Sequence, residues 1–576
     1  MLGRTDARRV SDAAARPALG RWEVATATLA GVLIAAAMHW PIPIRIGTEI
    51  PSDLGDPLLQ AWQVAWGGHA LIHQPLDYFQ SNAFSPLRNS LAFSDALLGY
   101  APAGLIGRGP EAAVVRYNLL FLFAYALAFV GPYLLVRELG VGRVGGFVAG
   151  AAFAYAPWRL AQDGHLHVLS SGGIPLCLFL LLRGYRTGRP LIVCAGWLVA
   201  CWQVLLGFTL GLQLLYLLGA LGLVAVVALA TRRLRVGRPV ALATVAGLVV
   251  LAGTTVLLSR PYLQVRRDHP EARRTEPVIR AESPQLRSYV TAPPDNLVWG
   301  AATKRFLTPP LTHDPQEKTL FPGLVVLGLA AVGTFSAVYP RRLRIGLVVG
   351  VALCAVLALG ISRGGVRLPF EPYRLLFDYA PGWNGIRTPG RLNTLTSLGL
   401  ALLAAGGAQA LTSWLRRRAP RGGPVAVAAG VLIVVAILAE GAGFRLGTQA
   451  SAIAGPPHAR VPPAPPGQRD APAPQQHLPI EPSRYLLWST DGFPAITDGV
   501  GAFEPRFTQR LRAEMRAFPN RESVSRLRAL GVRTVIFHPD LAAGTSWERV
   551  AARPVRGLRV RREAKGGVVL FHLAPG

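Results

Sequence analysis

The chain has 576 residues, of which 51% are apolar and only 16% are charged. A soluble protein of this length carries more charge and fewer unbroken apolar runs, so the composition indicates a membrane protein. The formal net charge of +29 does not indicate nucleic-acid binding, because the basic residues are mostly arginines in short clusters between apolar runs, and no nucleic-acid-binding motif is present.

Apolar runs long enough to cross a bilayer core of ~30 Å recur along most of the chain. They lie near residues 23–41, 113–136, 144–158, 168–183, 190–206, 208–230, 239–258, 320–339, 345–362, 392–415 and 424–442. These runs predict eleven membrane spans within a core of residues 23–442. Ten or twelve spans are the alternatives, because the third and fourth runs are short and the fifth and sixth almost touch.

Arginine clusters mark one side of this predicted membrane core. They occur in the basic N-terminus, residues 1–22, and after spans two, four, six, eight and ten, which is the same side if eleven spans are counted. By the positive-inside rule this side is the cytoplasm. We therefore expect a multi-pass plasma-membrane protein with a cytoplasmic N-terminus and an extracytoplasmic C-terminus.

The opposite, outer side carries three long loops, 42–112, 259–319 and 363–391, and the C-terminal tail. The tail starts with a Pro-rich linker, residues 443–480, which is too rich in proline for a helix or a central strand. In residues 481–576 the helix-like "SVSRLRALGVR" leads into the strand-like "TVIFH". The pattern predicts an α-helical polytopic membrane protein with a small extracytoplasmic α/β domain at its C-terminus.

Two carboxylates open the first outer loop, in "DLGDPLLQAWQVAW". The stretch after them is amphipathic, and its two tryptophans are typical of a helix lying at the membrane interface. One interpretation is that Asp53 or Asp56 caps this helix ahead of Pro57. The other is that one of them is a catalytic carboxylate.

A second polar group, "RLAQDGHLHVLSS", lies between spans three and four on the same side. The spacing of His165 and His167 places both on one face of a strand, and Asp163 is near enough to complete a metal site. The alternative is an ordinary polar loop between two apolar spans. A divalent metal is therefore one option for a cofactor, and the sequence names none with certainty.

Arginines form a third group on the outer side. Arg260, Arg266 and Arg267 follow span seven in a long loop, whereas Arg387 and Arg391 lie in the short "GWNGIRTPGR" before span ten. The positive-inside rule disfavours arginines in a short outer loop. Bidentate binding of a phosphate at the membrane surface accounts for them, and arginines that snorkel to lipid headgroups are the alternative.

With these residues the sequence resembles the GT-C superfamily of polytopic membrane glycosyltransferases, in particular its bacterial YfhO-like and mannosyltransferase-like branch. The resemblance is carried by "DLGDPLLQAWQVAW" at 53–66, "DGHLHVLSSGGIPLCLFLL" at 163–181, "EKTLFPGLVVLGL" at 317–329, "PGWNGIRTPGRLNTLTSLGLALLAA" at 381–405 and the "YLLWST…GVGAFEP…LRALGVRTVIFH" tail.

The resemblance implies a hexosyltransferase that uses a polyprenyl-phosphate-linked sugar and a glycan, lipid or protein acceptor of the cell envelope on the outer face of the membrane. It implies that Asp56 is the general base, with Asp53 as the alternate. Arg387, Arg391 and Arg260 would then bind the donor phosphate.

The resemblance also implies an orienting role, toward the acceptor, the base or a metal, for His165 together with Asp163 and His167. The sequence lacks the paired Asp-Glu that protein mannosyltransferases have in the corresponding loop, which leaves the acceptor open.

Two other functions are consistent with a polytopic core. One is a transporter or flippase for lipid-linked envelope precursors, and the other is a catalytically silent membrane assembly protein. Against the transporter, the candidate polar residues lie in outer loops rather than inside the apolar runs, and no inverted repeat is visible.

Overall fold

The computed structural model describes residues 19–233, 235–361, 371–418, 422–443, 448–450 and 474–574. The basic N-terminal segment before residue 19, most of the predicted Pro-rich linker and the start of the predicted loop 363–391 lie outside the described residues.

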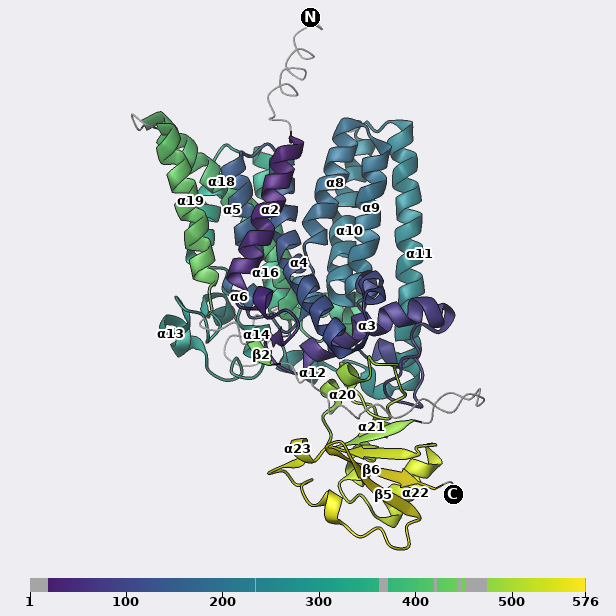
Figure 1. Cartoon of the computed structure of the whole chain (residues 1–576). Coiled ribbons are helices and arrows are strands. Elements are labelled where there is room, and N and C mark those ends of the chain that lie inside the picture. The colour runs from purple at the N-terminus through teal and green to yellow at the C-terminus, as the bar shows by residue number, and fades with distance from the viewer. Residues whose placement is uncertain are drawn as a thin grey trace, which may run out of the picture.

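A bundle of long helices forms the body of the protein (Figure 1). Its members are α2 (Arg21–Met38), α4 (Gly109–Glu138), α5 (Arg143–Ala154), α8 (Gly173–Thr187), α9 (Pro190–Leu206), α10 (Phe208–Ala230), α11 (Arg238–Asp268), α15 (Leu324–Phe335), α16 (Arg341–Ala358), α18 (Asn393–Arg418) and α19 (Gly422–Gly441). A helix thus lies at each of the eleven predicted positions. In the described parts of the chain, seven helices are long and apolar enough to cross a membrane, so the polytopic membrane class is confirmed.

Two helix boundaries differ from the prediction. Helix α11 continues to Asp268, so that Arg260, Arg266 and Arg267 lie on a helix and not in a loop. Helix α15 begins only at Leu324, because the Glu440 carboxylate from the end of α19 accepts hydrogen bonds from the first two backbone N–H groups, those of Leu324 and Val325. A buried acceptor from a distant helix sets this start, and no local pattern reveals it.

Short helices and turns gather at one end of the bundle. Helix α3 (Asp56–His73) lies across this end. The others are α6 (Pro157–Leu160), α7 (Leu166–Leu169), α12 (Glu276–Ala281), α13 (Gly300–Thr303), α14 (Pro315–Lys318) and α17 (Pro372–Tyr379). Strand β1 (Glu49–Pro51) pairs antiparallel with β2 (Thr448–Ala450) at the same end. The polar residues of interest all belong to these segments or to helix ends next to them.

The prediction that α3 places its tryptophans at lipid headgroups is wrong. Trp62 and Trp66 are 2% and 3% exposed, and the Trp62 indole donates a hydrogen bond to the Asn82 side chain at 3.0 Å. They pack with Phe84 and Phe93 in a hydrophobic cluster of their own. The helix lies across the bundle as expected, but protein and not lipid covers this face.

The C-terminal residues 474–574, called the cap domain below, form a small α/β unit beyond this end of the bundle (Figure 1). Its elements are β3 (Gln475–Leu478), α20 (Pro482–Trp488), α21 (Arg506–Met515), α22 (Arg521–Ala529), β4 (Thr534–Phe537), α23 (Pro539–Ala542), β5 (Val560–Lys565) and β6 (Val568–Leu573). The sheet order is β3-β4-β6-β5, with β3 and β4 parallel and the other pairs antiparallel. Helix α22 leads into β4, as the sequence predicted.

The cap domain is joined to the segment between α2 and α4 by backbone hydrogen bonds. The Ile496 N–H donates to the Asn82 carbonyl, the Phe84 N–H to the Asp498 carbonyl, and the Ala502 N–H to the Phe93 carbonyl, at 2.7–3.1 Å. These bonds fix residues 493–505 of the cap domain over the end of the bundle. The cap domain therefore forms part of any cavity at this end.

Candidate active site

A cavity of about 710 Å³ lies where the cap domain meets the end of the bundle. Its walls come from α3, α7, α10, α11, residues 92–95 before α4, the segment after α11, the segment before α18, and residues 501–503 of the cap domain. Its charged and titratable lining residues are Asp56, Asp95, His167, Arg266, Arg274, Arg387 and Arg391. The fold thus brings Asp56, His167, Arg387 and Arg391 together, as the resemblance implied, from segments that are distant in the sequence.

Asp56 is the first residue of α3, and its side chain is 44% exposed, toward the cavity. The helix is capped by Gly55 without a side-chain hydrogen bond, so the capping interpretation is wrong for Asp56. Asp53 instead makes a local turn, in which its Oδ1 accepts a hydrogen bond from the Gly55 N–H at 2.7 Å. Asp53 is exposed and does not line the cavity.

Asp56 lies beside His165, with Oδ2 and Nε2 3.3 Å apart. The Gln162 amide donates to the Gln316 carbonyl, so its Oε1 must accept the His165 Nδ1–H at 2.9 Å. With Nδ1 protonated, the Nε2 of a neutral His165 has a lone pair toward Asp56. Hence the Asp56–His165 contact becomes a hydrogen bond only when the pair holds one further proton.

One turn after Asp56, Gln60 fixes the position of His165. The Gln60 side chain accepts a hydrogen bond from the Leu166 N–H at 2.7 Å and donates to the Gly164 carbonyl at 3.2 Å. Asp56 and Gln60 share a helix face because they are four residues apart. This spacing of polar residues in an otherwise apolar helix is the signal by which the sequence could have revealed Gln60.

The environment keeps Asp56 ionised. Burial alone would raise the pKa of its carboxyl group, but the hydrogen bond and charge of a protonated His165, together with the charge of Arg391, lower the pKa below its ordinary value. A carboxylate that is ionised at neutral pH and faces a cavity can accept a proton from a bound hydroxyl group.

Arg391 is predicted to bind the donor phosphate, but its guanidinium already has a partner within the protein. Its guanidinium forks onto the buried Glu317 carboxylate, with Nη2–Oε1 at 2.5 Å and Nε–Oε2 at 3.2 Å. Its Nη1 donates to His167 Nε2 at 3.0 Å, which makes His167 a neutral acceptor. Burial alone would raise the pKa of Glu317, but the Arg391 charge lowers it to about 2. The charge of Arg391 is thus already compensated by protein.

Asp95 is a second carboxylate in the cavity, and the sequence analysis did not single it out. Its Oδ1 accepts a hydrogen bond from the Phe208 N–H at 2.6 Å, at the first residue of α10, and its Oδ2 lies 3.7 Å from His167 Nε2. A single acidic residue in a long loop gives no pattern of its own. The position of the Asp95 side chain is fixed by its contact with α10, which lies more than a hundred residues later in the sequence.

The other arginines of the cavity have no such compensation. Arg266 Nη1 donates to Asn384 Oδ1 at 2.8 Å, and Arg274 Nη2 donates to the Ala502 carbonyl at 3.0 Å. Arg387 is exposed to the cavity. Within the described parts of the chain, none of the three forms an ion pair. Arg260, by contrast, is exposed on α11 and does not line the cavity.

The strand expected for the two histidines does not form. His165 instead precedes the short helix α7. Asp163 points away from the cavity, accepts a hydrogen bond from the Tyr125 hydroxyl at 2.7 Å and lines a second cavity of about 170 Å³. Burial, with the nearby Asp295 charge, raises the pKa of Asp163 to about 7.

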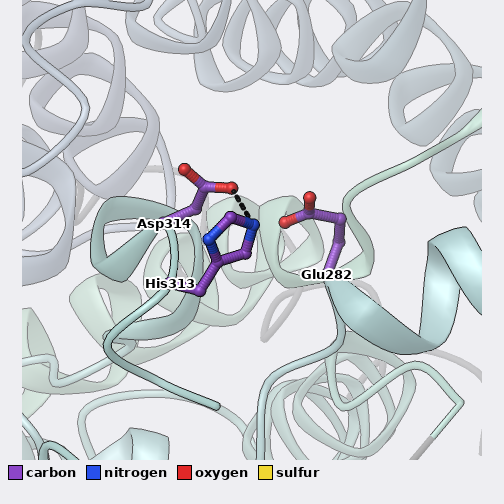
Figure 2. Close-up of side chains that lie close together, drawn as sticks. All are labelled: Glu282, His313 and Asp314. Carbon is purple, nitrogen blue, oxygen red and sulfur yellow. Dashed lines mark ion pairs between the residues drawn. The ribbon is translucent and has the colours of Figure 1, made fainter. Parts of the chain in front are cut away.

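A metal site at these residues is not supported by the geometry. Among the described residues, the group of three ligand atoms within 4.8 Å of one another belongs to Glu282, His313 and Asp314. Figure 2 shows the His313 ring between the two carboxylates. The buried ammonium group of Lys318 lies 3.9 Å from Glu282 Oε2 and already compensates this cluster in part. This group does not include His165, beside which the sequence leaves a divalent metal as one option.

One side of the main cavity is apolar. Between α10 and α11 it is lined by Phe208, Leu212, Leu215, Tyr216, Thr255, Ser259 and Leu263. Both helices are among those long and apolar enough to span a membrane, and their outward faces are largely exposed. The cavity therefore combines a slot between two membrane helices with a charged chamber at the end of the bundle.

No protein-family model matches the sequence, and no curated protein matches it. The structure is similar to that of the arabinofuranosyltransferase AftD from Mycobacteria, with a TM-score of 0.54 and 16% identity over 97% of this chain and 40% of AftD. This similarity shows that the two chains share a fold. A mutant form of AftD gives a TM-score of 0.54 and 15% identity over 97% of this chain and 42% of that one.

ArnT from Cupriavidus metallidurans bound to undecaprenyl phosphate gives a TM-score of 0.36 and 14% identity, over 97% of this chain and all of that one. The chain spans about two-fifths of the length of AftD. The predicted GT-C-like architecture is thus confirmed, and the YfhO-like branch stays a prediction.

Proposed function

We propose that this GT-C protein is a hexosyltransferase that moves a sugar from a polyprenyl-phosphate donor to a hydroxyl group of an envelope acceptor, with Asp56 as the general base. The observation that carries the proposal is the composition of one cavity. A free carboxylate, three arginines without ion pairs in the described parts of the chain, and an apolar slot between two membrane helices meet there. These are the parts that a lipid-phosphate-sugar donor and a hydroxyl acceptor require.

The chemistry follows from the charges. The acceptor oxygen attacks the anomeric carbon while its proton passes to Asp56, and the bond from the anomeric carbon to the phosphate oxygen breaks. The electron pair of that bond leaves with the polyprenyl phosphate, and attack from the opposite side inverts the anomeric centre. The arginines stabilise the negative charge that grows on the leaving phosphate.

His165 supports Asp56 in this reaction. When His165 is neutral, the lone pair on its Nε2, 3.3 Å from Asp56 Oδ2, can receive the proton that the base has taken, which restores the carboxylate for the next cycle. Arg391 and His167 act as positioning residues, because the Arg391 guanidinium is held by Glu317. Asp53 lies near Asp56 in the sequence but outside the cavity.

The cavity faces the extracytoplasmic side in this proposal. The cap domain and the turn that joins α10 to α11, with its arginines, lie at opposite ends of the bundle (Figure 1). If the basic turns are cytoplasmic, the cavity opens outside the cell. The similarity to AftD, an arabinofuranosyltransferase by name, supports a transferase, and the acceptor is an envelope glycan, lipid or protein.

The test is transfer of a radiolabelled sugar in membranes that contain the wild type, Asp56→Asn or Asp53→Asn at equal protein levels. We expect Asp56→Asn to lower transfer about a thousandfold with accumulation of the lipid-linked donor. Asp53→Asn is the matched control and should transfer normally. If Asp56→Asn transfers as well as the wild type, a flippase or a silent assembly protein becomes the better account.

A further inference from the structure

Residues 499–506 of the cap domain form one wall of the main cavity, with Gly501, Ala502 and Phe503 in its lining. Phe503 packs against Phe93 and His269, with ring centroids 5.0 and 5.9 Å apart. The Arg506 N–H donates to Glu271 Oε1 at 3.0 Å. This wall is therefore anchored on both sides, to the segment before α4 and to the end of α11.

The anchored wall holds Arg274. The Ala502 carbonyl accepts a hydrogen bond from Arg274 Nη2 at 3.0 Å, while the Ala502 N–H donates to the Phe93 carbonyl at 2.7 Å. A carbonyl oxygen orients a guanidinium but leaves its charge uncompensated. Burial, and then the charge of Arg387, lower the pKa of Arg274 to about 10. Two arginines thus lie close enough to repel each other.

Arg266, like Arg274, donates a hydrogen bond to a neutral oxygen. Its guanidinium is oriented by a neutral oxygen, Asn384 Oδ1 at 2.8 Å. The three arginines come from three segments, namely the end of α11, the segment after it and the segment before α18. Three positive charges gathered in one cavity, with no ion pair among the described residues, attract an anion.

We propose that the cap domain completes a phosphate-binding site, in which the wall around Ala502 and Phe503 positions Arg274 beside Arg266 and Arg387 to bind the phosphate of a polyprenyl phosphate. This inference rests on the proposed function and deepens it, because it makes the cap domain a part of the donor site. Arg274 contacts the ligand, and Phe503 is a positioning residue that acts through the Ala502 carbonyl.

The chemistry of the surroundings favours a lipid phosphate over a free one. Guanidinium groups match the geometry of phosphate oxygens, and the apolar slot between α10 and α11 opens into the same cavity. A bound polyprenyl chain would add buried apolar area to the ionic contacts. A free phosphate would use the arginines alone.

The first experiment measures binding to the full-length protein in lipid nanodiscs. Undecaprenyl phosphate, undecaprenol and inorganic phosphate are the three probes. We expect undecaprenyl phosphate to bind at least about tenfold more tightly than either of the others, since each lacks one half of the ligand. Tight binding of inorganic phosphate alone, or of undecaprenol as well as its phosphate, overturns the assignment of the site.

The second experiment tests the residues. Arg274→Gln should raise the Kd for undecaprenyl phosphate about tenfold to a hundredfold, because a charged group loses its hydrogen bonds to the phosphate. The matched control is Arg273→Gln, which removes the exposed neighbouring arginine that does not line the cavity. It should leave the Kd unchanged. Equal effects of the two variants overturn the proposal.

A double-mutant cycle tests whether the cap domain acts through Arg274. Phe503→Ala should raise the Kd in the wild-type background and have no further effect in Arg274→Gln. An equal effect in both backgrounds, or no effect in either, contradicts the inference. Glu271→Ala removes the acceptor of the Arg506 N–H, loosens the same wall and serves as the second variant if Phe503→Ala does not fold.

The outcome is separable from that of the proposed function. Asp56→Asn should lower transfer about a thousandfold without weakening the binding of undecaprenyl phosphate. If transfer is lost in Asp56→Asn but the cycle shows no coupling between Phe503 and Arg274, only the role of the cap domain fails. If the cycle shows coupling but Asp56→Asn transfers normally, only the general base fails.

Discussion

Arg387 and Arg391 stand four residues apart before α18 and line the same cavity, yet they differ in their partners. Arg391 is 9% exposed and forks onto Glu317, whereas Arg387 faces the cavity and has no ion pair with any residue that the structure describes. The charge of Arg391 is thus neutralised by a carboxylate of the protein, and the charge of Arg387 is left without an ion pair among the described residues. An arginine in a short outer segment can therefore either stabilise the fold through an ion pair or bind a ligand. The residues in contact with it decide which of the two applies.

The largest expected effect is a difference in the free energy of unfolding between variants of these two arginines. Arg391→Gln leaves Glu317 buried without its partner, and we expect it to lower the free energy of unfolding by about 3–5 kcal/mol. Arg387→Gln should change stability by less than about 0.5 kcal/mol, since it breaks no ion pair of the described chain. Thermal unfolding of both variants in the same detergent checks this. Equal loss in the two variants would erase the comparison.

The carboxyl groups of Asp163 and Glu317 should make the stability of the protein depend on pH in opposite directions. The pKa of Asp163 is raised to about 7, so its ionised form is disfavoured in the folded state, and wild-type stability falls as the pH rises from about 4 toward 7. We expect Asp163→Asn to be more stable than the wild type by about 1–2 kcal/mol at pH 8, and by nothing at pH 4. Melting temperatures at the two pH values measure it. A constant difference at both would contradict the raised pKa.

Glu317 should behave in the opposite way. Its folded pKa of about 2 lies below the ordinary value, so the ion pair with Arg391 stabilises the protein above about pH 4, and the stabilisation is lost as the pH falls toward 2. The stability difference between the wild type and Glu317→Gln should therefore shrink from pH 5 to pH 3. The same pH series, read beside Asp163→Asn, gives the two slopes with opposite signs.

The smallest expected effect concerns Asp95, which accepts a hydrogen bond from the first residue of α10 and lies beside His167. Asp95→Asn keeps an oxygen for the Phe208 N–H and removes the charge near His167, so we expect a loss of about 1 kcal/mol in stability. Asp77→Asn, in the same segment but outside the cavity, is the matched control. A loss as large as that of Arg391→Gln would mean that Asp95 carries part of the framework.

Much of this protein follows from local sequence. The eleven helix positions follow from apolar length, because a span of the bilayer core requires a fixed number of apolar residues whatever its neighbours. The α22–β4 unit follows from local periodicity. The unusual places of Asp56 and Arg387 are visible in the sequence as well, since a carboxylate at a helix start and an arginine on the disfavoured side of a membrane stand out without a structure.

The tertiary structure decided which polar residues are free. Glu317 compensates Arg391 across 74 residues, the Ala502 carbonyl orients Arg274 across more than two hundred, and the cap domain buries Trp62 and Trp66 away from lipid. Each of these depends on a contact between distant segments. Ion pairing and burial are properties of the surroundings of a side chain, whereas apolar length and local periodicity are properties of the chain itself, and only the second kind can be predicted from the sequence.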